Sequence, residues 1–278
     1  MKVVRTRAEL REARAALPGP VGFVPTMGAL HEGHASLVRR ARDECRSVVA
    51  SIFVNPTQFA ANEDLSRYPR DDAGDLALFE SLGVDLAFTP GVDEIYLPGA
   101  SMTVDVGRLG EVLEGAARPG HFRGVATVVT ILFNLVQPDR AFFGQKDGQQ
   151  SVVVRRLVRD LGMPVEIVVC PTIREADGLA MSSRNRYLTA DEQAQAPTLH
   201  RALQAAAGAV ATGEKSADRL RAVMTSELAS APLGEIDYVS VADAETLQEF
   251  EVVDRPALAS LAVRFPSARL IDCQQLDD

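Results

Sequence analysis

A chain of 278 residues with 46% hydrophobic residues is long enough for one large or two modest globular domains. Its net charge of −9 and isoelectric point near 5.1 argue against a broad nucleic-acid surface, yet they permit a nucleotide site with a few local cations. We expect no membrane span and no signal peptide, and we expect the three separated cysteines to be reduced thiols of a cytoplasmic protein.

The first two thirds of the chain alternate strand-like and helix-like runs. Apolar runs predict strands at residues 21–24, 47–54, 84–89, 140–143 and 165–170. Amphipathic runs or runs stopped by Gly or Pro predict helices at residues 36–45, 73–82, 125–136 and 149–161. Such alternation is typical of an α/β fold with a doubly wound parallel sheet.

The last third has a different pattern. A capping box at Thr189 and Glu192 predicts one alanine-rich helix through about Ala211, and Ser216 predicts the cap of another helix through Ala229. Short strands are predicted at residues 236–241, 258–263 and 270–273. We therefore expect a first domain at residues 1–174 and a smaller α+β domain at residues 175–278.

One motif follows the first predicted strand of the sheet. It reads Pro25-Thr26-Met27-Gly28-Ala29-Leu30-His31-Glu32-Gly33-His34 and leads into a helix. A strand, a glycine-bearing turn and a helix N-terminus together favour an anion site, because backbone N–H groups and the helix dipole point to one place. His31 and His34 share one face of the first helical turn. Two capping histidines or part of a zinc site are the alternatives, although no further ligand trio accompanies them.

Three other polar segments are candidates for the same site. Asn55-Pro56-Thr57-Gln58 and Gly144-Gln145-Lys146-Asp147 each follow a predicted strand, and parallel sheets bind ligands at that edge. Lys146 can reach phosphate as a point charge, and Gln58 can both donate and accept hydrogen bonds to a polar acid. Ser182-Ser183-Arg184-Asn185 adds hydroxyls and a guanidinium suited to phosphate. Read alone, each segment is more often a turn, a surface pair or a loop than a binding site.

Five ordered motifs resemble one known family. The stretch PTMGALHEGH resembles the HIGH signature of adenylate-forming nucleotidyltransferases and, in full, that of the pantoate–β-alanine ligases. The family's NPTQF, GEKDxQQ and R-x-x-HFxGV segments resemble residues 55–59, 144–150 and 118–125, and residues 174–185 resemble its counterpart of the KMSKS loop. Gln145 and Gly148 depart from the family, the first in charge, the second in size and helix propensity.

The resemblance implies a Rossmann-like domain that binds ATP and pantoate, followed by a smaller lid domain. It implies an ATP- and Mg²⁺-dependent condensation of pantoate with β-alanine through pantoyl adenylate, with release of AMP and pyrophosphate. It also implies a cytoplasmic homodimer that binds neither nucleic acid nor membrane. No Ser or Cys nucleophile with a partner base is evident, so a covalent enzyme intermediate is not required.

The resemblance also assigns residues. It implies catalytic roles for His34, as proton donor to pyrophosphate, and for His31, Lys146 and Arg184. ATP binding falls to Pro25, Thr26, Met27, Gly28, Ala29, Leu30, His31, Glu32, Gly33, His34, Gly144, Gln145, Lys146, Asp147, Ile173, Met181, Ser182, Ser183 and Arg184, with Met27 and Ile173 beside the adenosine. The residues implied to bind pantoate and β-alanine are Gln58, Gln150, Asn55, Arg118 and His121.

Asp75 is the candidate metal residue. It lies in a helix start with Asp71 and Asp72, which read alone is a solvated acidic turn. The family places a magnesium-associated Asp near this position, where the chain has Gly74 instead of a second acid.

Two rival functions remain open. One is another HIGH-type adenylate-forming enzyme or nucleotidyltransferase, including a synthetase fragment that charges RNA, which the acidic isoelectric point disfavours. The other is a catalytically silent nucleotide-binding module.

Overall fold

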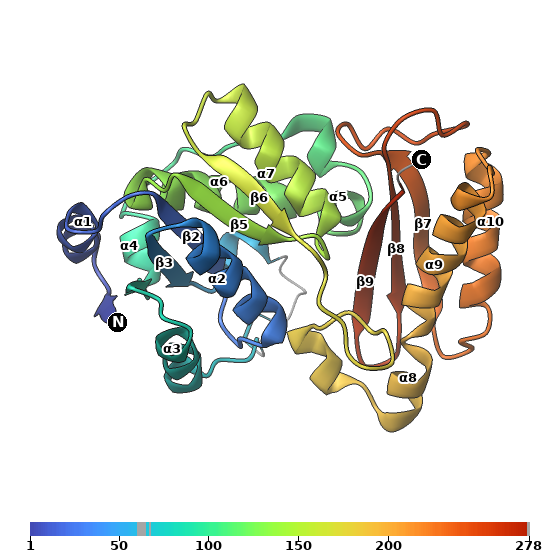
Figure 1. The fold of residues 1–278 in the computed structure, drawn as a ribbon, viewed down its shortest axis with the longest axis horizontal. Helices are drawn as coiled ribbons and strands as arrows, with labels where there is room; N and C mark the ends of the chain where they lie inside the picture. Colours follow the sequence, from blue (N-terminus) through green and yellow to red (C-terminus); the bar gives the residue numbers. More distant parts are fainter. Residues whose placement is uncertain (60–64, 67, 277–278) are drawn as a thin grey trace. The chain divides into compact units, whose positions relative to one another are not determined.

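The computed structural model describes residues 1–59, 65–66 and 68–276 (Figure 1). The chain forms two compact units, each described here by itself. The first consists of Met1–Gly144 and Val153–Cys170, and the second of Gln145–Val152 and Pro171–Asp278. The domain ranges 1–174 and 175–278 stay a prediction. No helix of the described residues is both long and apolar enough to cross a bilayer.

A parallel sheet forms the centre of the first unit, as expected for a doubly wound α/β fold. Its strand order, among the described residues, is β1-β4-β3-β2-β5-β6. The strands are β1 (Lys2–Val4), β2 (Val21–Thr26), β3 (Ser47–Ile52), β4 (Leu86–Phe88), β5 (Arg140–Gly144) and β6 (Glu166–Cys170). The strand order reverses between β2 and β5, and the edge beyond such a switch point is where open α/β sheets bind ligands.

Helices of the first unit cover both faces of this sheet. They are α1 (Arg7–Ala15), α2 (Glu32–Glu44), α3 (Asp72–Ser81), α4 (Val92–Ile95), α5 (Glu114–Ala117) and α6 (His121–Val136), with 3₁₀ turns η1 (Pro56–Gln58) and η2 (Gly107–Gly110) and with α7 (Gly148–Asp160), which begins in the second unit. Phe23 packs into the core that contains α6, whereas its neighbour Val24 packs into the core that contains α2. This alternation explains why the strands are apolar on both faces.

The sequence predicted five strands of this sheet but missed β1 and the helices α1, α4 and α5. The signal for α1 was present, since Thr6 and Glu9 form a capping box at its start. Helix α6 also begins at His121, one turn before the expected start at residue 125, because Gly120 takes up a left-handed conformation and lets the helix begin there.

The second unit contains an antiparallel sheet in the order β7-β8-β9, from β7 (Glu235–Asp243), β8 (Ala257–Arg264) and β9 (Arg269–Leu276). Its helices are α8 (Ala190–Gln195), α9 (Thr198–Ala211) and α10 (Ala217–Leu228), with the 3₁₀ turn η3 (Ser183–Tyr187). Leu203, Leu220 and Leu261 meet in one core, which packs α9 and α10 against one face of the sheet.

The single helix predicted from Thr189 to Ala211 is wrong. The Thr189 capping box is present, but α8 ends at Gln195 and α9 starts at Thr198. Pro197 separates the helices because it has no N–H for the helical ladder and its ring clashes with the preceding turn. The Ser216 cap is confirmed, since its side chain accepts a hydrogen bond from the Arg219 N–H at the start of α10.

Candidate functional site

The turn between β2 and α2 is held from outside by a buried carboxylate. Gly28 and Ala29 have φ of 81° and 51°, a left-handed conformation that is uncommon for alanine. Asp75 of α3 is 4% exposed and accepts hydrogen bonds from the N–H groups of Ala29 at 2.8 Å and Leu30 at 2.7 Å. Burial raises the pKa of Asp75, although these two hydrogen bonds oppose the rise.

The backbone donors of this turn are already used within the protein. Besides the two bonds to Asp75, Thr26 Oγ1 accepts from the Gly28 N–H at 3.2 Å, and His31 Nδ1 accepts from the Gly33 N–H at 3.1 Å. These four N–H groups thus bond within the protein, and an anion site at this helix N-terminus stays a prediction. Polar side chains and the dipole of α2 are further features that favour a phosphate here.

His31 and His34 cap the helix that they begin. His31 is the N-cap of α2, and His34 Nδ1 accepts a weak hydrogen bond from the His31 N–H at 3.4 Å. Since Nδ1 is the acceptor in both rings, each neutral imidazole carries its hydrogen on Nε2. The ring centroids lie 4.2 Å apart. Each ring in this form offers an Nε2–H hydrogen-bond donor, and the role of His34 as a proton donor stays a prediction.

Asn55 organises a buried cluster in the first unit. Its side chain is 1% exposed, and its Nδ2 donates to Gln58 Oε1 at 3.1 Å and to the Gly124 carbonyl at 3.2 Å. Its Oδ1 accepts from the Thr57 hydroxyl at 2.9 Å and from the Tyr96 hydroxyl at 2.7 Å. These contacts hold the Asn55 side chain in one orientation, and its contact with the substrate stays a prediction.

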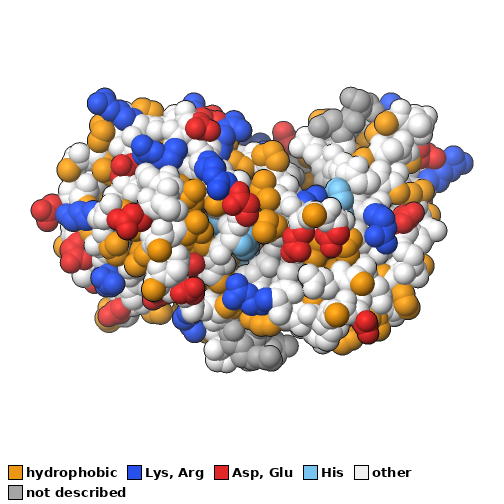
Figure 2. Space-filling view, turned by 60° about the horizontal axis from the view of Figure 1, so that its bottom comes forward, with side chains coloured by type: hydrophobic (Ala, Val, Ile, Leu, Met, Phe, Trp, Pro, Cys, Tyr) orange, Lys and Arg blue, Asp and Glu red, His pale blue; other side chains and the backbone are white. Residues whose placement is uncertain are grey.

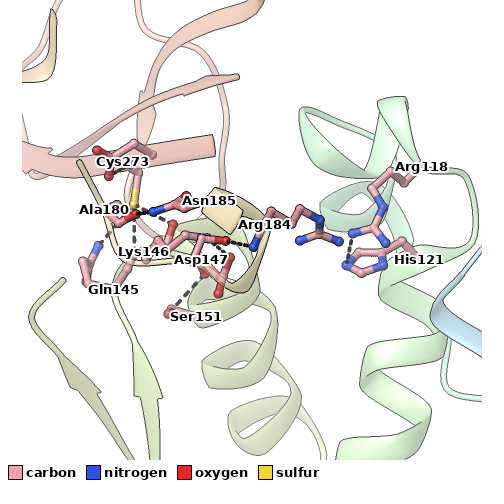
Figure 3. Close-up of polar contacts among 12 residues, drawn as sticks. Arg118, His121, Gln145, Lys146, Asp147, Ser151, Ala180, Arg184, Asn185 and Cys273 are labelled. Atoms are coloured by element: carbon pink, nitrogen blue, oxygen red, sulfur yellow. Dashed lines mark hydrogen bonds and ion pairs between the residues drawn. The ribbon is translucent and has the colours of Figure 1, made fainter. Parts of the chain in front are cut away.

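The same cluster fixes the amide of Gln58. Because Asn55 donates to Gln58 Oε1, the amide presents its Nε2 hydrogens, one of which points at the weak acceptor Met27 Sδ at 3.0 Å. His121 Nδ1 lies 2.9 Å from the Gln58 carbonyl, and Arg118 Nη1 lies 3.2 Å from His121 Nε2 (Figure 3). The structure thus brings together five of the predicted residues, namely Met27, Asn55, Gln58, Arg118 and His121. Sequence reasoning missed Tyr96, and no local motif marks it.

A second group of predicted residues meets in the second unit. Lys146, Ser182 and Arg184 line one pocket, together with Leu179, Ala180, Asn185, Leu199, Arg269, Leu270, Ile271 and Asp272. The Lys146 side chain is 19% exposed, and its Nζ lies 3.3 Å from Asp147 Oδ1 (Figure 3). Arg269 and Asp272 of this lining are paired with Asp237 and Arg174. Lys146 and Arg184, with the hydroxyl of Ser182, make the pocket suited to phosphate oxygens.

The segment that carries Ser182 and Arg184 is braced by three polar side chains. Arg174 donates to both carboxylate oxygens of Asp272, at 2.6 and 3.1 Å, and to the Gly178 carbonyl at 3.1 Å. Asn185 Nδ2 donates to the Ala180 carbonyl at 3.0 Å (Figure 3). Ser182 Oγ accepts from the Arg184 N–H at 3.2 Å and starts η3. These bonds fix the shape of the loop from within the protein.

Gly148, which departs from the family in size, is required by close packing. A Cβ at this position would lie 2.7 Å from Cys273 Sγ and 3.0 Å from a methyl carbon of Leu258. The Cys273 thiol donates to the Gln145 carbonyl at 2.9 Å, and burial raises its pKa to about 12. The thiol therefore fills the space that a larger residue at position 148 would take, and it is inert as a nucleophile.

No metal centre is evident in the part of the chain that the structure describes. Those residues contain no group of three or more His, Cys, Asp or Glu side chains that could hold an ion. Both oxygens of Asp75 already accept backbone hydrogen bonds. The described side chains therefore do not fit a metal held by the protein alone.

Comparisons with known proteins agree on one family. The family model described as pantoate-beta-alanine ligase matches residues 2–275. The chain is 61% identical over 273 residues to the pantothenate synthetase of Chloroflexus aurantiacus. The aligned region covers 98% of this chain and 97% of that protein. It is 60% identical over 272 residues to that of a Roseiflexus species, covering 98% of each.

Solved structures give the same picture. The crystal structure of pantothenate synthetase from Thermus thermophilus matches with a TM-score of 0.95 at 51% identity, covering all of both chains. The pantoate-beta-alanine ligase of Francisella tularensis, complexed with an ATP compound and β-alanine, matches with a TM-score of 0.80 at 32% identity, covering 99% of this chain and 97% of that one.

Proposed function

The chain belongs to the pantoate–β-alanine ligase family, and from this we propose how its own residues carry out the reaction. The protein is an ATP-dependent ligase that joins pantoate to β-alanine to give pantothenate. The observation in this chain that carries our assignment of residues is the pocket in which Lys146, Ser182 and Arg184 meet.

The proposed chemistry has two steps. A carboxylate oxygen of pantoate attacks the α-phosphorus of ATP, the bond from that phosphorus to the bridging oxygen breaks, and pyrophosphate leaves. The amine of β-alanine then attacks the acyl carbon of pantoyl adenylate, the acyl C–O bond breaks, and AMP leaves with the carboxylate oxygen while the amine loses a proton. Positioning and charge stabilisation suffice for both steps.

Each group of residues has a proposed part. The Nε2–H groups of His31 and His34 donate to the phosphates, and Lys146, Ser182, Ser183 and Arg184 hold the negative charge that grows on pyrophosphate. Met27 and Ile173 border the adenosine. The Nε2 hydrogens of Gln58, and the amide of Gln150, bind pantoate, while Asn55, His121 and Arg118 hold Gln58 in place.

Magnesium enters this proposal only with the nucleotide. Because the described side chains do not fit a protein-held metal, we propose that Mg²⁺ arrives bound to the triphosphate as part of the substrate. Mg²⁺ in nucleotide sites commonly keeps several waters and takes few protein carboxylates.

Gln58→Ala and Gln150→Ala are expected to weaken pantoate binding more than ATP binding. Each removes hydrogen bonds whose partner is left unpaired, worth about 1–3 kcal/mol, or about 5- to 150-fold in affinity. Measuring the dissociation constants of both ligands for each variant checks this. Equal losses for pantoate and ATP would mean that the glutamines shape the site in general.

Exchange of labelled pyrophosphate into ATP separates the rival functions. The proposed ligase exchanges only when pantoate is present, another HIGH-type enzyme requires a different acid, and a silent nucleotide-binding module does not exchange at all. An RNA substrate has little support, because on the face drawn in Figure 2 basic side chains are interspersed with acidic ones. A homodimer and a cytoplasmic location, which the family resemblance implies, stay proposals of the same kind.

A further inference from the structure

We propose that Asp75 is a positioning residue for the turn that carries His31 and His34. This inference rests on the proposed function, since it matters only if these histidines act on the nucleotide. The carboxylate comes from α3, 46 residues along the chain from Ala29, and receives the N–H groups of two successive residues of the turn.

The shape of the turn explains why a carboxylate is used. Gly28 and Ala29 both have positive φ, so the N–H groups of Ala29 and Leu30 point to the same side of the chain, toward Asp75. An ionised carboxylate has two acceptor oxygens, one for each N–H, at distances of 2.8 and 2.7 Å. An amide of the same shape would have one acceptor oxygen and would turn its NH₂ group toward the second N–H.

The position of the histidines follows from the turn. Leu30 is directly bonded to His31, which is the N-cap of α2, and His34 occupies the third helical position. A turn released by Asp75 would shift both imidazoles together. Gln58 contacts the turn only weakly, through Met27 Sδ, and is held by separate contacts to Asn55 and His121. Displacements of about 1 Å at a catalytic group can cost about 100-fold in rate.

Asp75→Asn tests this, with Asp72→Asn as the matched control. Asp72 lies in the same first turn of α3 and is exposed, so its substitution removes the same charge from the same helix without touching the turn. The turnover number of pantoate-dependent pyrophosphate exchange is expected to fall by about 10- to 100-fold in Asp75→Asn. The KM for pantoate and the Mg²⁺ concentration for half-maximal rate are expected to stay at the wild-type values, and Asp72→Asn is expected to match the wild type throughout.

A second variant disturbs the contact between Asp75 and the turn without changing Asp75 itself. In Gly28→Ala the new Cβ would lie 2.9 Å from Asp75 Oδ2, and the left-handed backbone would carry a side chain. It is expected to reproduce the loss of turnover with an unchanged Mg²⁺ dependence. In both variants the amides of Ala29 and Leu30 should exchange hydrogen faster, measured by NMR on the folded protein.

The outcomes separate the alternatives. A raised Mg²⁺ requirement in Asp75→Asn, absent from Gly28→Ala, would identify Asp75 as a metal contact and overturn the positioning role. Wild-type turnover in Asp75→Asn, or unchanged exchange of the two amides, would also overturn it. A wild-type protein without pantoate-dependent exchange would instead refute the proposed function.

Discussion

Replacing His34 with alanine is expected to lower pantoate-dependent pyrophosphate exchange by about 10²–10³-fold, the usual cost of removing one donor from a developing negative charge. Only the first half-reaction expels pyrophosphate, so only that half needs a donor near the bridging oxygen. Given pantoyl adenylate and β-alanine directly, the same variant should keep much more of its activity. Rapid-quench measurement of each half-reaction checks the prediction.

The chemical form of His34 can be tested in the same experiment. Its Nδ1 accepts the His31 N–H, which places the ring hydrogen on Nε2. His34→Gln supplies an amide N–H at a similar reach and should therefore recover part of the rate lost in His34→Ala. Failure of glutamine to recover any rate would favour proton transfer. An equal loss in both half-reactions would make His34 a structural member of the turn or a contact to AMP.

The second large effect is expected for Lys146→Ala, which should reduce the use of ATP by about 10²–10³-fold while the protein stays folded. The lysine is largely buried and lines the pocket with Ser182 and Arg184. Because little water reaches this position, water cannot take over the charge stabilisation that the lysine provides. Steady-state rates over a range of ATP concentrations, with circular dichroism as the check on folding, measure the effect.

Lys215→Ala is the matched control for Lys146→Ala. Lys215 belongs to the same unit and is exposed, and loss of an exposed lysine normally changes stability by less than about 0.5 kcal/mol. The control is expected to behave as the wild type. Near-normal activity of a folded Lys146→Ala protein would place this lysine outside the reaction.

The sheet could be predicted from the sequence because its signals are local. Strand β3 is buried along its whole length and apolar except for Ser47 and Ser51. Helices α3, α6 and α7 each end close to a glycine or a proline, so period and punctuation reveal these elements. The sequence also contained the signal for the break at Pro197, since proline disfavours a continuous helix. The motifs were placed correctly after β2, β3 and β5 for the same reason.

The interior of the site could not be predicted in this way. Asp75 reads as one of three acids at a helix start, and only the folded chain shows that it alone is buried and bonded to Ala29 and Leu30. Asn55 reads as a turn residue or a substrate contact, yet Tyr96, which holds it, is 41 residues away. Contacts between distant residues set burial and hydrogen-bond direction, and no local pattern encodes them.

The fate of the pantoate carboxylate oxygen tests the central claim most directly. Pantoate labelled with ¹⁸O in its carboxylate is incubated with ATP, β-alanine and the wild-type protein, and the phosphorus-containing products are examined by mass spectrometry. An adenylate intermediate predicts one labelled oxygen in AMP and none in pyrophosphate, because the acyl C–O bond breaks in the second step. Label in pyrophosphate or inorganic phosphate, or AMP without label, would contradict the account.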